Sequence, residues 1–279
     1  MVKENRLWHN FFSVIISIYC LITVILFVIV FVSSFRPAEE IFKSIWTIPR
    51  KIIFDNYLYL IRNRFFIYFW NSILVTVGSI VAILFLASLA SFGLGKFKFK
   101  GSQLVLGFFL LGVMFPAQVG IVPMFNIVRT LQLGNSLIGL IVIYASQLSI
   151  PVFVLTNFLK TIPDSIIESA KIDGAGTFRI YWKILLPMFQ PAIGAMIPLT
   201  AVGLWNDLFF PLIFLASKEK WTMPLGVLTY YSGRNGSFQL AKFGIAFAAV
   251  SISVLPMLIL YVFGSNKIID SITEGAIKQ

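Results

Sequence analysis

The chain has 279 residues, of which 58% are hydrophobic and 12% are charged, and its mean hydropathy is +0.92. A soluble domain usually carries about 25% charged residues, so the polar side chains here are too few to cover a globule in water. The composition therefore excludes an ordinary soluble protein and predicts one that crosses a membrane several times. The single cysteine, Cys20, excludes a disulfide within the chain.

Six uncharged stretches are long enough to cross a bilayer, which takes about 20 apolar residues. They are Phe11–Phe35, Phe65–Gly95, Gly101–Val128, Thr130–Leu159, Ile184–Asn206 and Phe243–Asn266. We expect helices, because a backbone in lipid must satisfy its own hydrogen bonds and the alternation of a barrel strand is absent. A turn at 133–136 places the start of the fourth helix near Leu137, and Pro116 favours a kink in the third.

The first stretch follows Lys3 and Arg6, so a cleaved signal peptide is an alternative for it. Its length exceeds the usual signal core of about 7–15 residues, which favours a retained first span.

The orientation of the spans follows from basic residues close to their ends. The total count of Lys and Arg is the same on both sides, but the basic N-terminus and the tight loop from Lys96 to Lys100 favour placing both termini in the cytosol. The opposing basic residues lie in a longer segment, 36–64, where Glu39, Glu40 and Asp55 dilute them.

A charged segment at 161–187, between the fourth and fifth spans, has the pattern of two short helices joined by a glycine turn. Pro163 suits a first helical position, and Ser165 with Glu168 is typical of a capping box. Gly174 is expected to end the first helix, and Thr177 to cap the second.

The second helix carries apolar residues at i, i+3, i+4 and i+7, and Pro187 is expected to end it. These residues, which predict one apolar stripe, are Phe178, Tyr181, Trp182 and Leu185. On pattern alone, an alternative is a pair of interfacial helices lying on lipid.

The spacing within this segment resembles the EAA loop of ATP-binding-cassette (ABC) importer permeases. That motif has Glu-Ala-Ala, three residues, Gly, nine residues and then Ile-x-Leu-Pro. The chain has Glu168-Ser169-Ala170, Gly174 and Ile184-Leu185-Leu186-Pro187 at the same spacing, and only Ser169 departs from it. Asp173 before Gly174 fits the common Asp-Gly-Ala form.

The resemblance extends to the carbohydrate branch of these permeases, which includes the smaller maltose-type permease subunit. Asn71-Ser72, the stretch from Trp205 to Pro211 and the stretch from Thr273 to Lys278 are similar to that branch. The first span and residues 36–64 are generic and add little.

The resemblance implies an all-α membrane protein with the six-helix bundle of a type I ABC importer permease, in one transmembrane domain, 1–279. It divides the chain into a coupling loop (161–187), a first outer loop (36–64), a second outer loop (214–239) and a cytosolic tail (265–279). The expected location is a bacterial or archaeal cell membrane.

The implied function is to form, with a second permease subunit, the pathway for a sugar or oligosaccharide. The expected partners are that second permease, two ATPase subunits and an extracytoplasmic solute-binding protein; nucleic acid is not expected. Glycerol-phosphate carriers share the pattern, so the particular solute stays open.

The resemblance also implies which residues contact the ATPase: Glu168, Ser169, Ala170, Asp173, Gly174, Leu186 and Pro187. ATP and Mg²⁺ are expected on the partner subunits, because this chain has no G-x-x-x-x-G-K-[ST] motif; at the nearest candidate, Gly95-Lys96, Ala90 replaces the first glycine. The sequence also lacks H-E-x-x-H, C-x-x-C and G-x-S-x-G, so we expect no metal, cofactor or catalytic residues.

Polar side chains within spans are candidates for the substrate pathway, because burying them in a membrane is costly. Four amides suit sugar hydroxyls, since each can donate and accept hydrogen bonds: Asn71, Gln118, Gln147 and Asn206. Phe115 and Tyr144 are candidates for stacking on a sugar ring. The alternative is that the amides bond between helices and serve the structure only.

The second outer loop is longer than the connection that two antiparallel helices need. Trp221, Tyr230, Tyr231 and Arg234 suit contact with another protein, and the resemblance implies that this loop enters the cleft of the binding protein. The alternative is an aromatic belt at the lipid headgroups. The tail is similarly expected to reach between the two ATPases, with a frayed terminus as the alternative.

An alternative function is an ion-coupled secondary transporter of a small polar solute, with Asp207 as the coupling carboxylate. Asp207 lies 20 residues after Pro187, about 30 Å along a helix and so near the outer interface, which argues against this role. An intramembrane enzyme is a third possibility, but the spans hold no Ser/His, Asp/Asp or metal-binding constellation.

Overall fold

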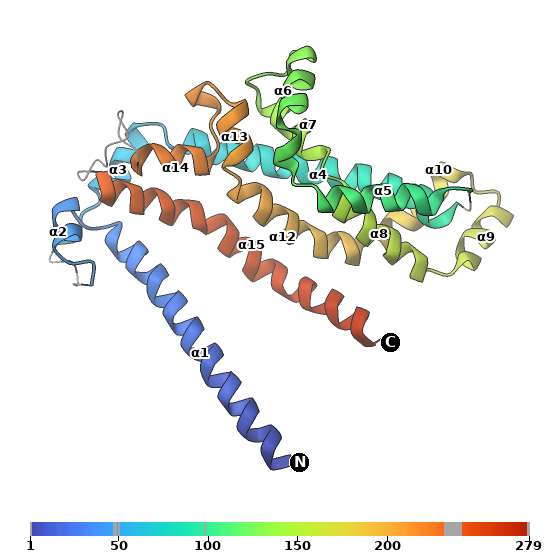
Figure 1. Ribbon diagram of the computed structural model, residues 1–279, viewed down its shortest axis with the longest axis horizontal. Helices are drawn as coiled ribbons and strands as arrows, with labels where there is room; N and C mark the ends of the chain where they lie inside the picture. The colour runs from blue at the N-terminus through green and yellow to red at the C-terminus, as the bar shows by residue number, and fades with distance from the viewer. Residues whose placement is uncertain (1, 47–48, 50, 98, 232–241, 278–279) are drawn as a thin grey trace. The chain divides into compact units, whose positions relative to one another are not determined.

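The computed structural model describes residues 2–46, 49, 51–97, 99–231 and 242–277, and within these residues all regular structure is helical (Figure 1). In chain order the elements are α1 (Val2–Ser33), α2 (Ala38–Lys43), α3 (Asp55–Arg62), α4 (Phe66–Lys96), α5 (Ser102–Met114), η1 (Ala117–Gly120), α6 (Ile121–Thr130), α7 (Leu137–Ala145), α8 (Ser149–Thr161), α9 (Asp164–Ile172), α10 (Thr177–Ile180), η2 (Tyr181–Leu185), α11 (Leu186–Met188), α12 (Gln190–Asn206), α13 (Phe209–Phe214), η3 (Lys218–Lys220), α14 (Met223–Tyr231) and α15 (Phe243–Ile277).

Six candidate spans emerge when each bent pair of helices is counted as one. Three single helices are long and apolar enough to cross a membrane, within α1, α4 and α15. Three further spans are bent, by 95° between α5 and the η1–α6 segment, by 48° between α7 and α8, and by 67° between α10–α11 and α12. The predicted all-α bundle is thus confirmed, whereas the third, fourth and fifth spans are broken helices.

The bend in the third span lies where proline predicts it. Pro116 falls between the end of α5 and the start of η1, and Phe115 before it is extended, with φ −92° and ψ 120°. The ring of a proline disfavours helical geometry in the preceding residue, which ends α5 here. The fourth span begins at Leu137 as expected, because the Ser136 hydroxyl accepts a hydrogen bond from the Gly139 N–H at 2.9 Å and caps α7.

The chain forms two compact units, which are described separately. The first comprises Met1–Phe66 and Gly226–Leu255, and the second comprises Ile67–Leu225 and Pro256–Gln279. The apolar side chains of α1, such as Phe11 and Ile22, are exposed. A helix that is apolar all round suits a lipid environment.

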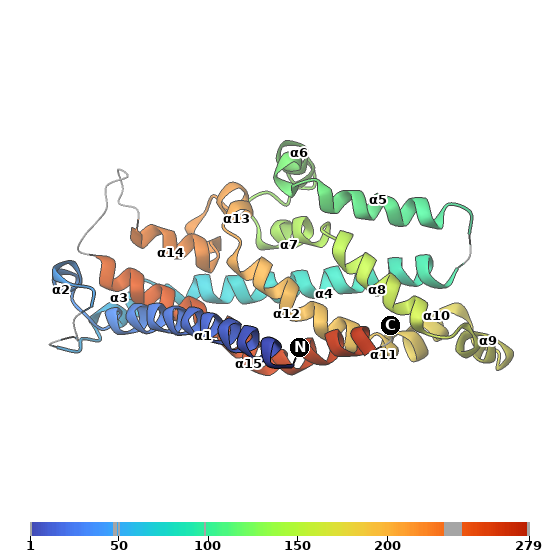
Figure 2. The same cartoon turned by 60° about the horizontal axis from the view of Figure 1, so that its bottom comes forward.

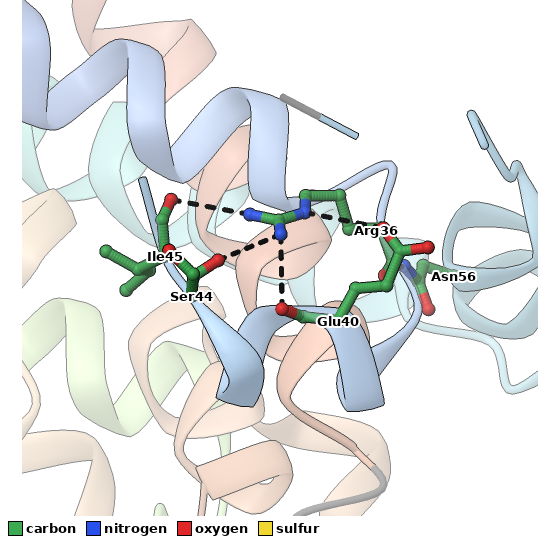
Figure 3. A network of polar contacts seen from close by, with 5 residues as sticks. All are labelled: Arg36, Glu40, Ser44, Ile45 and Asn56. Carbon is green, nitrogen blue, oxygen red and sulfur yellow. Dashed lines mark hydrogen bonds and ion pairs between the residues drawn. The ribbon is translucent and has the colours of Figure 1, made fainter. Parts of the chain in front are cut away.

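The first unit is organised around Arg36, whose residue is only 1% exposed (Figure 3). Its guanidinium donates hydrogen bonds to the carbonyls of Glu40, Ser44 and Ile45 at 3.1, 2.9 and 3.3 Å. Burying a charged group is costly unless it is hydrogen-bonded, so this cluster fixes the chain that follows α1. The part of the first outer loop from Arg36 to Ile45, which the sequence left without a motif, is therefore organised around one arginine.

Asn56 ties α3 to the same cluster (Figure 3). Its amide donates to the carbonyls of Ser34 and Arg36 at 2.8 and 3.0 Å. Gly244, near the start of α15, approaches this point closely: a Cβ there would lie 2.6 Å from Asn56 Nδ2 and 2.7 Å from the Arg36 carbonyl oxygen. Only glycine leaves room for α15 beside these groups.

The second unit contains two apolar clusters. One lies among α4, α7, α12 and α13 and includes Ile83, Leu140 and Leu204. The other lies among α8, α9, η2 and the start of α12 and includes Leu155, Ile167 and Leu185. Side chains of the coupling loop, Ile167 and Leu185 among them, are part of this second cluster, which packs the loop against α8 and α12.

Replacing Gly244 by alanine should lower the free energy of unfolding by about 1–3 kcal/mol, the usual cost of overpacking a filled site. The test is unfolding by a denaturing detergent in mixed micelles. Gly93→Ala in α4 is the matched control, because a Cβ at Gly93 would meet nothing within 4 Å. Equal stability of the two variants would contradict the close approach at Gly244.

Candidate functional site

The coupling loop has a closed turn at its centre. Gly174 has φ +75°, which places it in the left-handed region that favours glycine. The Gly174 N–H donates to the Lys171 carbonyl at 3.0 Å, and the Ala175 N–H donates to the Ala170 carbonyl at 2.9 Å. These two bonds form a Schellman motif, which satisfies the free carbonyls at the end of α9. The glycine predicted to end the first helix therefore does so by a specific turn.

Both helix caps predicted for this loop are wrong. Helix α9 begins at Asp164 with Pro163 at its N-cap, so Ser165 already lies inside the helix. A capping residue must itself be non-helical, and this excludes the capping box of Ser165 and Glu168. Helix α10 begins at Thr177, so Gly176 occupies the cap position expected for Thr177.

The exposed face of the coupling loop combines apolar side chains with charged ones of both signs, the basic ones being Lys171, Arg179 and Lys183. Of the residues predicted to contact an ATPase, Glu168, Ser169, Asp173, Gly174 and Pro187 are exposed, Leu186 is half-buried, and Ala170 is buried. Ala170 packs into the second apolar cluster of its own unit. It is therefore small because of packing within this chain.

Two exposed apolar residues of this face were not recognised from the sequence. Ile172 is 86% exposed, four residues after Glu168 on α9, and Phe178 is 76% exposed in the first turn of α10. In the sequence, Ile172 lies between two charged residues, Lys171 and Asp173. This position could have indicated that its side chain is exposed. Phe178 was assigned to the buried stripe instead.

The predicted apolar stripe on the second helix is only half correct. Tyr181 and Leu185 are buried, whereas Phe178 and Trp182 are exposed. The stripe assumes a regular α-helix, but Tyr181–Leu185 is a π-helix in which the Leu186 N–H donates to the Tyr181 carbonyl. The wider turn shifts the side chains around the axis. The helix also runs past Pro187 to Met188, and the bend lies at Phe189.

Tyr181 fixes this segment to α4. Its hydroxyl lies 2.7 Å from the Ser88 hydroxyl, and both residues are buried. Its ring lies 5.5 Å from that of Phe92 between centroids, and the ring of Trp182 stacks on Phe85 at 6.2 Å. The aromatic contacts that hold this segment to α4 are therefore made by Tyr181 and Trp182.

The base of the second outer loop is held by side chains from two other segments. The Asn71 amide donates to the carbonyls of Glu219 and Trp221 at 2.8 and 2.9 Å, and the Ser72 hydroxyl accepts from the Met223 N–H at 2.7 Å. Asn71 was predicted as a pathway residue, and here it supports the backbone of the loop.

Asn135 holds the same loop from the turn between α6 and α7. Its Oδ1 accepts from the N–H groups of Ala216 and Ser217 at 3.0 and 3.1 Å, and its Nδ2 donates to the Ser217 hydroxyl at 2.8 Å. The Lys220 ammonium donates to its carbonyl at 2.6 Å. Asn135 has φ 50°, a left-handed conformation that asparagine tolerates better than most residues.

The other residues predicted to contact a binding protein differ in exposure. Trp221 is half-buried and its indole N–H donates to the Leu215 carbonyl at 3.1 Å. Tyr230 is 8% exposed, and Tyr231 is half-buried, so burial raises the pKa of its hydroxyl. Arg234 and the tip of the loop lie outside the described residues.

The four amides predicted to line a pathway are not joined by hydrogen bonds to one another in the part of the chain that the structure describes. Gln118 is exposed in η1, directly after the bend at Pro116, and Gln147 is exposed in the break between α7 and α8. Asn206 ends α12, is exposed, and donates to the Val202 carbonyl at 3.0 Å. Gln118 and Gln147 thus both lie at broken points of spans.

Asp207 caps a helix. Its carboxylate accepts hydrogen bonds from the Tyr144 hydroxyl and from the N–H groups of Phe209 and Phe210, at 2.9 and 3.3 Å for the latter two. These bonds satisfy the first N–H groups of α13. This role argues against Asp207 as the coupling group of an ion-driven transporter.

The sequence matches one family over most of its length. The model of the family described as "Binding-protein-dependent transport system inner membrane component" matches residues 86–270. A putative ABC transporter permease protein, ORF2, of Caldicellulosiruptor sp. strain Rt8B.4 is 33% identical over 279 residues, which cover 99% of this chain and 98% of that protein.

Two other relatives are named for the solutes of their systems. The diacetylchitobiose uptake system permease protein NgcG of Streptomyces coelicolor is 29% identical, with 99% of this chain and 91% of that protein covered. The multiple sugar-binding transport system permease protein MsmG of Streptococcus mutans is 28% identical, and the match covers all of both chains.

A solved structure has the same fold. It is a chain of a bacterial ABC transporter involved in the import of the acidic polysaccharide alginate, with a TM-score of 0.82 and 21% sequence identity. The match covers 94% of this chain and 97% of that one. At this identity the likeness establishes the arrangement of helices.

Gly174→Val should strain the turn of the coupling loop, because a non-glycine residue in the left-handed region costs about 1–2 kcal/mol. We expect faster amide hydrogen exchange at the C-terminal end of α9, measured by mass spectrometry. Gly176→Val is the control in the same turn, since Gly176 has φ −68° and a Cβ there would meet nothing within 4 Å. The same exchange rate in both variants would contradict this account of Gly174.

Proposed function

We propose a function on the premise that this chain belongs to the family of binding-protein-dependent transport system inner membrane components, whose model matches residues 86–270. It is the permease subunit of a binding-protein-dependent ABC importer. Its bent and straight spans provide the membrane part of the transporter, and the energy comes from separate ATPase subunits.

The transported solute is a sugar or oligosaccharide. Relatives similar over nearly the whole chain are named for the uptake of diacetylchitobiose and of multiple sugars. The exposed amides of Gln118 and Gln147, at the breaks of the third and fourth spans, support this class, since amides both donate to and accept from hydroxyl groups. Asn206 is exposed and offers the same chemistry, whereas the donors of Asn71 are already engaged by the second outer loop.

The working transporter contains this chain, a second permease subunit, two ATPase subunits that bind ATP and Mg²⁺, and an extracytoplasmic solute-binding protein. Both termini lie in the cytosol, which places the coupling loop and the tail on the side of the ATPases. The backbone of α15 runs to Ile277, while the side chains from Ser265 onward lie outside the described part. The tail reaches between the ATPases, and the second outer loop faces the binding protein.

The observation that carries the proposal is the surface of the coupling loop. Glu168, Asp173, Ile172 and Phe178 are exposed together on two short helices whose turn is closed at Gly174. A rigid projection with exposed apolar and acidic groups suits a cleft in another protein, because the apolar side chains gain by leaving water and the carboxylates select basic partners. Movement of the ATPases then pulls this loop, and the pathway opens alternately to the two sides.

Uptake tests the function as a whole. Cells that lack this chain should lose uptake of one or more radiolabelled mono- or oligosaccharides from a panel, and the chain should restore it. Uptake by the purified transporter in liposomes should require ATP and the companion ATPases and should not respond to ionophores. Uptake driven by a proton or sodium gradient without ATP would overturn the assignment.

Glu168→Ala should weaken the contact with the ATPase by about 1.5–3 kcal/mol, the usual worth of a hydrogen bond to a charged group. The measurements are the amount of ATPase that co-purifies with this chain and the rate of uptake. Glu39→Ala is the matched control, because Glu39 is also exposed but lies in the first outer loop. Wild-type co-purification and uptake in Glu168→Ala would contradict the coupling role.

A further inference from the structure

Helix α4 is continuous where its neighbours in the second unit are broken (Figures 1 and 2). It runs from Phe66 to Lys96 and contains no proline, whereas the third, fourth and fifth spans bend by 95°, 48° and 67°. From Asn71 to Lys96 it rises by about 37 Å at about 1.5 Å per residue, which exceeds the hydrocarbon thickness of about 30 Å. One unbroken helix is therefore long enough to cross the hydrocarbon of a bilayer.

The C-terminal end of α4 is clamped to the start of the coupling loop by Lys96. The lysine side chain is only 4% exposed, and its ammonium donates to the Ile162 carbonyl at 2.6 Å and to Asp164 Oδ1 at 2.9 Å. Ile162 follows the last residue of α8, and Asp164 is the first residue of α9. A positive charge at this joint is favourable both to the C-terminal end of α8 and to the Asp164 carboxylate.

A second contact joins α4 to the far side of the coupling loop. Ser88, two turns before Lys96, pairs with the Tyr181 hydroxyl at 2.7 Å, and Phe92 packs on the Tyr181 ring. Lys96 thus holds the helix before the Gly174 turn, and Ser88 with Phe92 holds the helix after it. The coupling loop cannot tilt without pulling on α4 at both places.

Helix α4 is also packed closely against the fourth span at several points along its length. The Ser91 hydroxyl donates to the Val152 carbonyl at 3.1 Å, and a Cβ at Gly95 would lie 3.1 Å from Leu159 Cβ. A Cβ at Gly78 would lie 2.9 Å from the end of the Ile141 side chain. These contacts resist bending of α4, because displacing it would open gaps in a filled interface.

The N-terminal end of α4 holds the base of the second outer loop. Asn71 binds the carbonyls of Glu219 and Trp221, and the Ser72 hydroxyl accepts from the Met223 N–H. Asn135 fixes the same base independently, through Ala216 and Ser217. The base of the loop, residues 216–223, is therefore expected to move with the start of α4.

We propose that α4 is a connecting rod between the coupling loop and the second outer loop, with Lys96 as the positioning residue at one end and Asn71 at the other. The proposal rests on the proposed function, since it assigns the route by which a displacement of the coupling loop by the ATPases reaches the second outer loop. Lys96 binds neither nucleotide nor solute. It acts by fixing the joint of α8 and α9 to the rod.

The experiment uses the intact transporter, purified by a tag on this chain and reconstituted in lipid. In a Cys20→Ser background, Lys218→Cys carries a bimane fluorophore, because Lys218 lies on η3 with its ammonium 5.8 Å from the centre of the Trp221 ring, and tryptophan quenches bimane at short range. The probe is Mg-ATP with vanadate, which traps the nucleotide on the ATPases. We expect trapping to change the fluorescence of this label.

Lys96→Met should reduce the change by about fivefold or more, the lower end of typical couplings between distant sites, at equal trapped nucleotide. Lys96→Arg should keep most of it, because a guanidinium still donates to both oxygens. Lys100→Met is the matched control, since Lys100 is exposed in the neighbouring loop and should leave the response unchanged. Tyr181→Phe, which keeps the ring and removes only the hydroxyl contact with Ser88, should give a smaller reduction.

The outcomes separate the rod from the proposed function. If no ATPase co-purifies and no nucleotide is trapped by the unmodified transporter, the proposed function fails. If nucleotide is trapped but the label does not respond, or if Lys96→Met and Tyr181→Phe both respond fully, the rod is overturned. If Lys96→Met does not assemble, Tyr181→Phe decides the same question in a folded protein.

Discussion

The second unit is shaped by one constraint. Where a membrane helix is broken, backbone N–H and C=O groups lose their partners within the helix, and the hydrocarbon offers no water to replace them. Three of its spans are broken. Polar side chains bind backbone groups at several helix ends and in the connections between helices. Asp207 receives the N–H groups at the start of α13, and Lys96 binds the carbonyl just past α8. Asn71 and Asn135 satisfy the backbone of the second outer loop in the same way. Polar side chains thus bind backbone groups that the ends and connections of these helices would otherwise leave without a partner.

This constraint also divides the polar residues of the spans into two groups. Asn71 and Ser91 donate hydrogen bonds to backbone carbonyls, and Asp207 accepts them from backbone N–H groups, so these three residues hold the fold. Gln118 and Gln147 lie at breaks and remain exposed. Because a polar group in a membrane is costly unless it is satisfied by protein, water or solute, the exposed pair carries the stronger argument for a pathway.

The sequence predicted the elements that local chemistry decides. The number of spans, the start of the fourth helix at Leu137, the bend at Pro116 and the turn at Gly174 all follow from apolar length, capping serine, proline and glycine. It did not predict features that depend on contacts distant in sequence. The π-helix at Tyr181–Leu185 shifted the apolar stripe, and Arg36 organised a loop that had no motif, because three backbone carbonyls converge on its side chain. The capping box failed because the helix begins at Asp164, two residues earlier than a cap at Ser165 requires.

The contrast between straight and bent spans has a mechanical meaning. A break lets two halves of a span move separately, whereas a continuous helix passes displacement from end to end because its hydrogen bonds run unbroken. In the second unit the bent spans carry the exposed amides, and the straight α4 carries the clamps at both ends. A permease needs both properties, since its pathway must open and close while a signal crosses the membrane intact. Prolines are absent from α4 and lie at or beside the bends of the third, fourth and fifth spans, but proline alone does not decide a break, because α12 and α15 continue through Pro198 and Pro256.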